Sequence, residues 1–122
     1  MKIAVSATGK TLENQLDMRF GRADYFLIVE TDTMEYEALD NKAISASGGA
    51  GISAAQMVAD KDAQAVITGN VGPNAMNVLN AANIEIYKGS AISAKENIEQ
   101  YKKGTLEKIG KAVPPHSGMG RK

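Results

Sequence analysis

Residues 63–87 read AQAVITGNVGPNAMNVLNAANIEIY and carry the clearest structural pattern in the chain. The apolar run at 63–68 predicts a buried strand. The loop at 69–73 contains a proline that suits the first turn of a helix, and residues 74–82 have apolar side chains at helical spacing. A second apolar run at 84–87 predicts another strand. Strand, helix and strand in this order predict a βαβ unit with a right-handed crossover.

The N-terminal part of the chain predicts more strands of the same sheet. The β-branched run at 2–7 indicates a buried strand, and YFLIVE at 25–30 is typical of a central strand covered on both faces. Residues 34–39 alternate between the two faces of a weaker strand, and the turn residues before them predict a hairpin. The polar stretch at 8–24 predicts a long loop, and long loops in compact domains are often functional.

Two further helices flank the βαβ unit. A glycine- and serine-rich connector at 45–51 leads into residues 52–60, whose wide apolar face predicts a helix. Ser93 and Glu96 have the spacing of a capping box, which predicts the start of the last helix. Gly104 is suited to end that helix.

The order of elements is therefore β-β-β-α-β-α-β-α, which predicts an α/β fold with a mixed sheet and helices on its faces. We expect residues 1–106 to form a single domain. Residues 107–122 are rich in glycine, proline and lysine and predict a flexible tail. From about Lys111 onward we expect the tail to be mobile, because docking it would bury too little apolar surface to offset its backbone entropy.

The composition excludes several classes of protein. Lysine and arginine number 14 and aspartate and glutamate also number 14, so the zero net charge gives no electrostatic reason for a nucleic-acid partner. There is no cysteine, which excludes disulfides and thiolate-bound metals. No apolar run is long enough for a membrane helix or a signal peptide. We therefore expect a cytoplasmic protein with no membrane and no nucleic-acid partner.

The glycine-bearing loops before two of the predicted helices are candidate binding elements. Glycines let backbone N–H groups approach a ligand, and a helix N-terminus favours an anion. The predicted binding residues of these loops are Gly49, Gly51, Gly69, Asn70 and Gly72. The alternative is that the glycines serve only tight turns, since neither loop matches a Walker or dinucleotide motif.

A third candidate element lies near the end of the long loop, where Arg19, Gly21 and Arg22 surround Phe20. Arginine suits bidentate recognition of carboxylates and phosphates, so we predict that Arg19, Gly21 and Arg22 belong to the binding site. The alternative is a solvated pair of arginines. We expect Phe20 to anchor the loop in the core rather than to contact a ligand.

The only histidine, His116, is the candidate metal ligand, with Met119 as a soft neighbour. The alternative is that His116 is exposed polar surface on the tail. Standard catalytic sets are absent, because the chain has no cysteine nucleophile and the first strand carries no carboxylate. The residues therefore favour a binding protein over an enzyme.

Several motifs together resemble the dinitrogenase iron–molybdenum cofactor biosynthesis family. Each motif alone is weak, but their order along nearly all of residues 1–106 is fairly specific. The motifs are IAVS at 3–6, GKTL at 9–12, RFGRA at 19–23, GAGI at 49–52, VITGNVGPNA at 66–75, IEIY at 84–87 and YKKGTL at 101–106. The closing HSGMG at 116–120 is similar to the tails of small stand-alone members.

The resemblance implies a ribonuclease H-like three-layer fold with a five-stranded mixed sheet. It also implies that the chain binds or carries an iron–sulfur or iron–molybdenum type metallocluster, or its precursor, as cargo that is not required for folding. A cofactor-assembly protein is then an expected partner. Two departures from the family pattern stand out: Thr8 precedes Gly9 where many members have aspartate, and Ala23 stands where some members have cysteine.

Two other functions remain open at this stage. One is a regulatory or interaction module that senses a small anion without metal, using the same glycine loops and arginines. The other is a hydrolase that acts through a metal bound by His116. The anion-sensing module differs from a carrier because it needs no metal for binding. The hydrolase differs from a carrier because it would show turnover.

Overall fold

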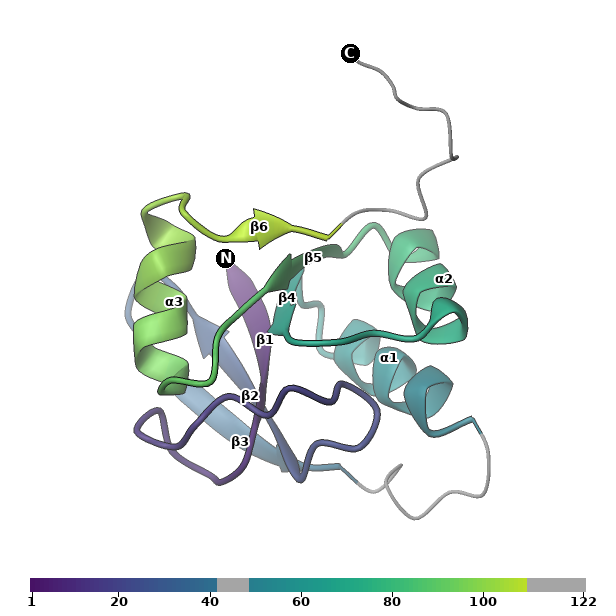
Figure 1. Ribbon diagram of the computed structural model, residues 1–122, viewed down its shortest axis with the longest axis horizontal. Helices are drawn as coiled ribbons and strands as arrows, with labels where there is room; N and C mark the ends of the chain where they lie inside the picture. Colours follow the sequence, from purple (N-terminus) through teal and green to yellow (C-terminus); the bar gives the residue numbers. More distant parts are fainter. Residues whose placement is uncertain (42–48, 110–122) are drawn as a thin grey trace.

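The computed structural model describes residues 1–41 and 49–109. It contains α- and β-elements in nearly the predicted order (Figure 1). They are β1 (Lys2–Ala7), β2 (Tyr25–Glu30), β3 (Tyr36–Asp40), α1 (Ala50–Asp60), β4 (Ala65–Thr68), α2 (Pro73–Ala81), β5 (Glu85–Lys88), α3 (Ala94–Lys102) and β6 (Glu107–Lys108). The predicted metal ligand His116, and the part of the predicted tail from residue 110, lie outside the described residues.

The strands form one mixed sheet in the order β3-β2-β1-β4-β5-β6. β1, β2 and β3 are antiparallel neighbours, so the predicted hairpin of β2 and β3 is confirmed. β1 pairs with β4, and β4 with β5, in parallel. Parallel neighbours require crossover connections, and α2 supplies the one between β4 and β5, as the βαβ pattern predicted.

The sheet of the described chain has six strands, which corrects the expected five. The added strand is β6, whose Glu107 and Lys108 pair with Lys88 and Tyr87 of β5. Two polar residues give no strand pattern in sequence. They become a strand because the outer edge of β5 offers unpaired backbone groups that the returning chain can bond.

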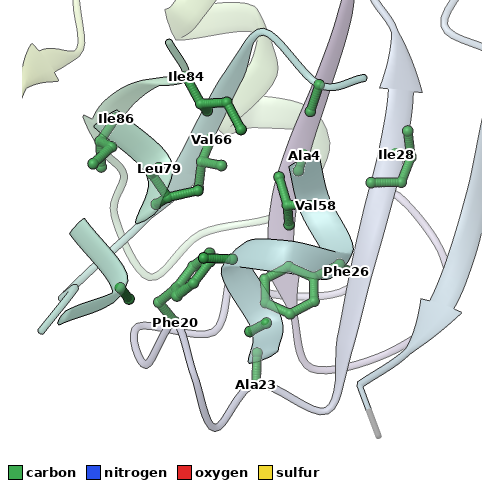
Figure 2. Close-up of a cluster of buried hydrophobic side chains, with 14 residues drawn as sticks. Ala4, Phe20, Ala23, Phe26, Ile28, Val58, Val66, Leu79, Ile84 and Ile86 are labelled. Carbon is green, nitrogen blue, oxygen red and sulfur yellow. The ribbon is translucent and has the colours of Figure 1, made fainter. Parts of the chain in front are cut away.

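Helices cover both faces of the sheet, which gives three layers (Figure 1). One core lies under α1 and α2 and includes Phe20, Phe26 and Leu79. Figure 2 shows the rings of Phe20 and Phe26 together in this core, and Phe20 is 1% exposed. The expectation that Phe20 anchors the loop is confirmed. The second core lies under α3 and part of the long loop, around Leu16 and Ile98.

The long loop between β1 and β2 is held against the sheet by hydrogen bonds to distant residues. The Leu16 N–H donates to the carbonyl of Ile92 (2.9 Å), and the Asp17 N–H donates to that of Ser6 (2.9 Å). The fully buried Ser6 hydroxyl lies 2.6 Å from the Asp17 carbonyl oxygen and 2.7 Å from the Thr68 hydroxyl. The loop therefore has a defined path, although it lacks long regular elements.

Asn97 on α3 holds the turn that precedes its own helix. Its side chain is fully buried. The side-chain oxygen accepts from the Ser90 N–H (2.9 Å), and the side-chain nitrogen lies 3.0 Å from the carbonyl oxygens of Ser90 and Ser93. The predicted helix start at Ser93 is confirmed, because the Ser93 hydroxyl accepts from the Glu96 N–H (3.1 Å). The carboxylate of Glu96 completes the predicted pair differently from a capping box, since it accepts from the Ser93 hydroxyl (3.2 Å).

We expect Asn97→Ala to lower the free energy of unfolding by about 2 kcal/mol, because it leaves buried backbone groups without partners. Urea denaturation followed by circular dichroism measures this change. Glu99→Ala, at an exposed position of the same helix, is the control and should stay within about 0.5 kcal/mol of the parent. Equal stabilities for the two variants would contradict the role of Asn97 in holding the turn before α3.

In the described ranges, 1–41 and 49–109, no helix is both long enough and apolar enough to cross a membrane.

Candidate functional site

The N-termini of α1 and α2 meet at a pocket of about 210 Å³. It is lined by Gly21, Gly49, Gly51 and Gly72, together with Phe20 and first-turn residues of both helices. These four glycines come from three separate segments of the chain. The structure thus brings together four residues that the sequence suggested as binding residues.

Among the residues that the structure describes, neither helix has a side-chain cap at this pocket. The N-cap residues are Gly49, with a left-handed φ of 69°, and Gly72, and no acidic residue occurs in the first turn of either helix. The first N–H groups of a helix have no partner within it, and they carry the positive end of the helix dipole. Two uncapped helix starts that face one pocket make a favourable environment for an anion.

Close backbone contacts keep this pocket compact. A Cβ atom on Gly21 would lie 2.8 Å from the Cα of Gly51, and one on Gly51 would lie 3.2 Å from the Cβ of Ala75. Gly21 therefore allows the long loop to contact α1, and Gly51 allows α1 to approach α2. A Cβ on Gly72 would meet nothing within 4 Å, so this position opens toward the pocket.

Asn41 holds the loop that carries Gly21. Its buried side-chain nitrogen donates to the carbonyl oxygens of Gly21 (3.1 Å) and Ala23 (2.8 Å). Its backbone N–H donates to the carbonyl of Asp24 (3.1 Å). Sequence reasoning missed Asn41. The available signal was a polar residue directly after a strand, which is too common to indicate a role.

The predicted binding residue Arg19 forms an ion pair within the protein. Its guanidinium donates to both carboxylate oxygens of Asp17, at 3.1 and 3.0 Å, and its backbone N–H donates to the same group. Asp17 is 5% exposed at its side chain and Arg19 is 62% exposed. Hydrogen bonding to Asp17 raises the pKa of the Arg19 guanidinium. Much of the charge of Arg19 is therefore offset by an acid that the sequence did not single out.

Arg22 differs from Arg19 in having no ion-pair partner within the described part of the chain. It is exposed and directly follows Gly21, which lines the pocket. An exposed cation that is adjacent in sequence to a pocket residue, with no carboxylate partner among the described residues, can attract an anion from solvent. Of the two predicted arginines, Arg22 is thus the better suited to a ligand.

Gly69 and Asn70 position the arginine loop and do not line the pocket. A Cβ on Gly69 would lie 2.6 Å from the carbonyl oxygen of Met18. The Asn70 N–H donates to that same carbonyl (2.7 Å), and the Asn70 carbonyl accepts from the Phe20 N–H (3.1 Å). These contacts fasten the end of β4 to the segment that bears Phe20, Gly21 and both arginines.

The pocket contains no side chain that would ligate a metal strongly. Its described lining has no histidine, aspartate or glutamate, and residues 1–41 and 49–109 contain no group of three or more such side chains that could hold a metal ion. The donors among the described lining residues are backbone N–H groups and the side-chain amide of Asn74. They fit the sulfur or oxygen periphery of an anion and do not fit direct coordination of a metal centre.

Comparison with known proteins identifies one matching family and several similar proteins. Residues 1–104 match the family described as dinitrogenase iron–molybdenum cofactor. An uncharacterised protein of Methanocaldococcus jannaschii is 34% identical over 112 residues, which cover 89% of this chain and 92% of that protein. Its similarity extends over almost the full length of both chains.

Two solved structures are also similar. The apo form of the orange protein from Desulfovibrio gigas has a TM-score of 0.86 and 36% identity, covering 88% of this chain and 92% of that one. A Thermotoga protein described as a candidate NifB protein has a TM-score of 0.79 and 30% identity, with 96% and 98% coverage. The family match extends from β1 through α3, and on this evidence the chain belongs to the dinitrogenase iron–molybdenum cofactor family.

Proposed function

We propose that this protein is a non-enzymatic carrier that binds an anionic metallocluster, or a precursor of one, in the pocket between α1 and α2. The observation that carries the proposal is the meeting of two uncapped helix N-termini at one glycine-lined pocket. Family membership supports a cofactor-related role. The cargo would be of the iron–sulfur or iron–molybdenum type.

The pocket would hold the cargo through its outer atoms. N–H groups from the first turns of α1 and α2 would donate to peripheral sulfur or oxygen atoms, while Arg22 would attract the anion. Hydrogen bonds of this kind are directional but reversible. A site without a strong metal ligand would release its cargo more readily than a thiolate site, which suits a carrier. A single metal bond from His116, which lies outside the described residues, would add one exchangeable ligand to these contacts.

A second candidate function is a module that senses a small anion without metal. It uses the same pocket, and it is favoured by the lack of histidine, aspartate and glutamate among the described residues that line it. The two functions differ in what the pocket accepts. A carrier should bind a synthetic thiolate-ligated iron–sulfur cluster under anaerobic conditions, whereas a sensor should bind phosphate or a carboxylate and ignore the cluster.

The sharpest test replaces Gly72, the N-cap of α2, with aspartate. The backbone at Gly72 (φ −70°, ψ 165°) is extended and a Cβ there meets no atom within 4 Å, so the fold should accept the change. Aspartate is a good N-cap and interacts favourably with the helix dipole, which should raise stability by up to about 1 kcal/mol. The same carboxylate would repel an anion in the pocket. Stability and binding should therefore change in opposite directions.

The expected loss of affinity for the synthetic cluster is about fivefold or more, since one opposing charge at about 4 Å costs about 1 kcal/mol even in water. Gly72→Asn is the matched control, because it caps the helix without adding charge. Thermal unfolding reports stability, and anaerobic gel filtration with metal analysis reports binding. Undiminished binding by the aspartate variant would exclude this pocket as the site.

A further inference from the structure

β3 forms one outer edge of the sheet. It pairs with β2 on one side over five consecutive residue pairs, from Tyr25 with Asp40 to Val29 with Tyr36. No strand pairs with its other side in the described chain (Figure 1). The register contains no interruption, and β3 contains no proline. Bulges and prolines are two of the ways in which natural proteins protect an edge strand, and β3 has neither.

The hydrogen-bonding pattern shows which groups of β3 face outward. The Glu30 N–H donates to the Glu35 carbonyl (2.8 Å), and the Asn41 N–H donates to the Asp24 carbonyl (3.1 Å). Hydrogen-bonded pairs alternate along an antiparallel ladder, so Glu37 and Leu39 direct their backbone groups toward β2.

The residues between them, Tyr36, Ala38 and Asp40, therefore direct their N–H and C=O groups away from the sheet. Among residues 1–41 and 49–109, no backbone group is bonded to these outward positions. The edge thus offers an uninterrupted row of donors and acceptors at a spacing that a second extended chain would match.

The charges along this edge are acidic. Glu35, Glu37 and Asp40 lie on or next to β3, which has no basic residue of its own. Two lysines of the described chain lie close to these acids. The ammonium of Lys61, at the end of α1, is 3.3 Å from the Glu37 carboxylate in an exposed pair, and Lys2 lines the same surface hollow as Glu35 and Glu37. An excess of negative charge remains. It disfavours pairing of β3 with a second copy of itself, because like charges would be brought together.

The same charges favour a strand that carries lysine or arginine. On the α3 face of the sheet, such a strand would meet Tyr36 and Ala38, which oppose the buried residues Val29 and Leu27 of β2. Tyr36 is 41% exposed, so its ring has surface left to cover. On the α1 face it would meet Glu37 and the half-buried Leu39.

We propose that the β3 edge docks a basic, extended segment of a partner protein as an additional antiparallel strand. Backbone hydrogen bonds would supply affinity, and the acidic side chains would select a basic sequence. The β3 edge is separate from the pocket between α1 and α2, and this proposal does not depend on that pocket. The two are nevertheless neighbours along the chain, because β3 is followed directly by Asn41, which holds Gly21 in place.

The test is a titration of the full chain, labelled with ¹⁵N, with an end-blocked nine-residue peptide of alternating lysine and valine. The control peptide has glutamate in place of lysine. We expect saturable binding of the basic peptide only, with increased hydrogen-exchange protection at the amides of Tyr36, Ala38 and Asp40. Protection elsewhere, or equal binding of the acidic peptide, would overturn the proposal.

Two variants separate backbone pairing from charge. Ala38→Pro removes one outward N–H that β2 does not use, and proline is tolerated at such edge positions. It should weaken peptide binding by roughly tenfold, which is the effect of losing about one hydrogen bond. Asp40→Lys should weaken it without altering the backbone, and Glu99→Lys, on exposed α3 surface, should leave it nearly unchanged.

A proline variant that binds like the parent would overturn the proposal, provided that its unfolding temperature shows it is folded. If that variant is unfolded, the Asp40 and Glu99 pair decides the question through the charge effect alone. The other possible occupant of the β3 edge is a second copy of this chain. Sedimentation of the protein without peptide would detect such a dimer. A concentration-dependent dimer would assign the edge to a second copy of this chain and would also overturn the proposal.

Discussion

Replacing Phe20 with alanine should lower the free energy of unfolding by about 3–5 kcal/mol, the usual cost of truncating a buried aromatic residue. Phe20 is 1% exposed, and its ring centroid lies 5.2 Å from that of Phe26 in a tilted arrangement. The two rings sit in the core beneath α1 and α2 (Figure 2). The truncation removes transfer energy, leaves a cavity, and loses the aromatic pair.

The same change should also weaken ligand binding, because Phe20 forms part of the pocket lining. Urea denaturation with linear extrapolation gives the stability change, and binding should be measured well below the unfolding midpoint. Phe20→Leu is the control. It keeps most of the volume and should cost about 1.5 kcal/mol or less. A small loss for the alanine variant would mean that the loop does not depend on this anchor.

The second large effect is expected for Gly69→Ala, with a loss of about 3 kcal/mol, the upper part of the range for overpacked sites. The new Cβ would lie 2.6 Å from the carbonyl oxygen and 2.7 Å from the Cα of Met18. Both are backbone atoms, so no side-chain rotation can relieve the contact. The loop would have to move, and that would strain the hydrogen bonds between Asn70 and the segment at Met18 and Phe20.

Gly72→Ser is the matched control for Gly69→Ala. It lies in the same loop, its Cβ meets nothing within 4 Å, and serine is a good helix N-cap. Its stability should stay within about 0.5 kcal/mol of the parent or rise slightly. Denaturation of both variants under one condition checks the comparison. Similar losses for the two would show that the contact with Met18 does not explain the effect.

Sequence pattern predicted most of the regular elements because their signals are local. The apolar run at Tyr25–Glu30 is β2, and the proline of the 69–73 loop begins α2 as expected. The glycine loops before two helices also pointed to the pocket, since a helix start that follows glycine leaves N–H groups accessible. The ordered motifs identified the family, which residues 1–104 match.

Other features could not be predicted because they depend on residues far apart in the chain. β6 exists through its pairing with β5. The burial of Asp17, whose carboxylate offsets the charge of Arg19, depends on the contact of the long loop with Ser6 of β1. Asn41 supports Gly21 across an interval of 20 residues. Each of these contacts is polar and specific, and none leaves a periodic trace in the sequence.

The sequence by itself therefore determined the element types, the mixed sheet and the family, since periodicity and motif order act over short distances along the chain. Only the tertiary structure decided which glycines line one pocket and which merely allow close packing. Gly21 and Gly51 meet where the long loop crosses α1, while Gly69 contacts Met18 away from the pocket. That division follows from the sheet order, because the order places distant loops on the same edge and brings their backbones into contact.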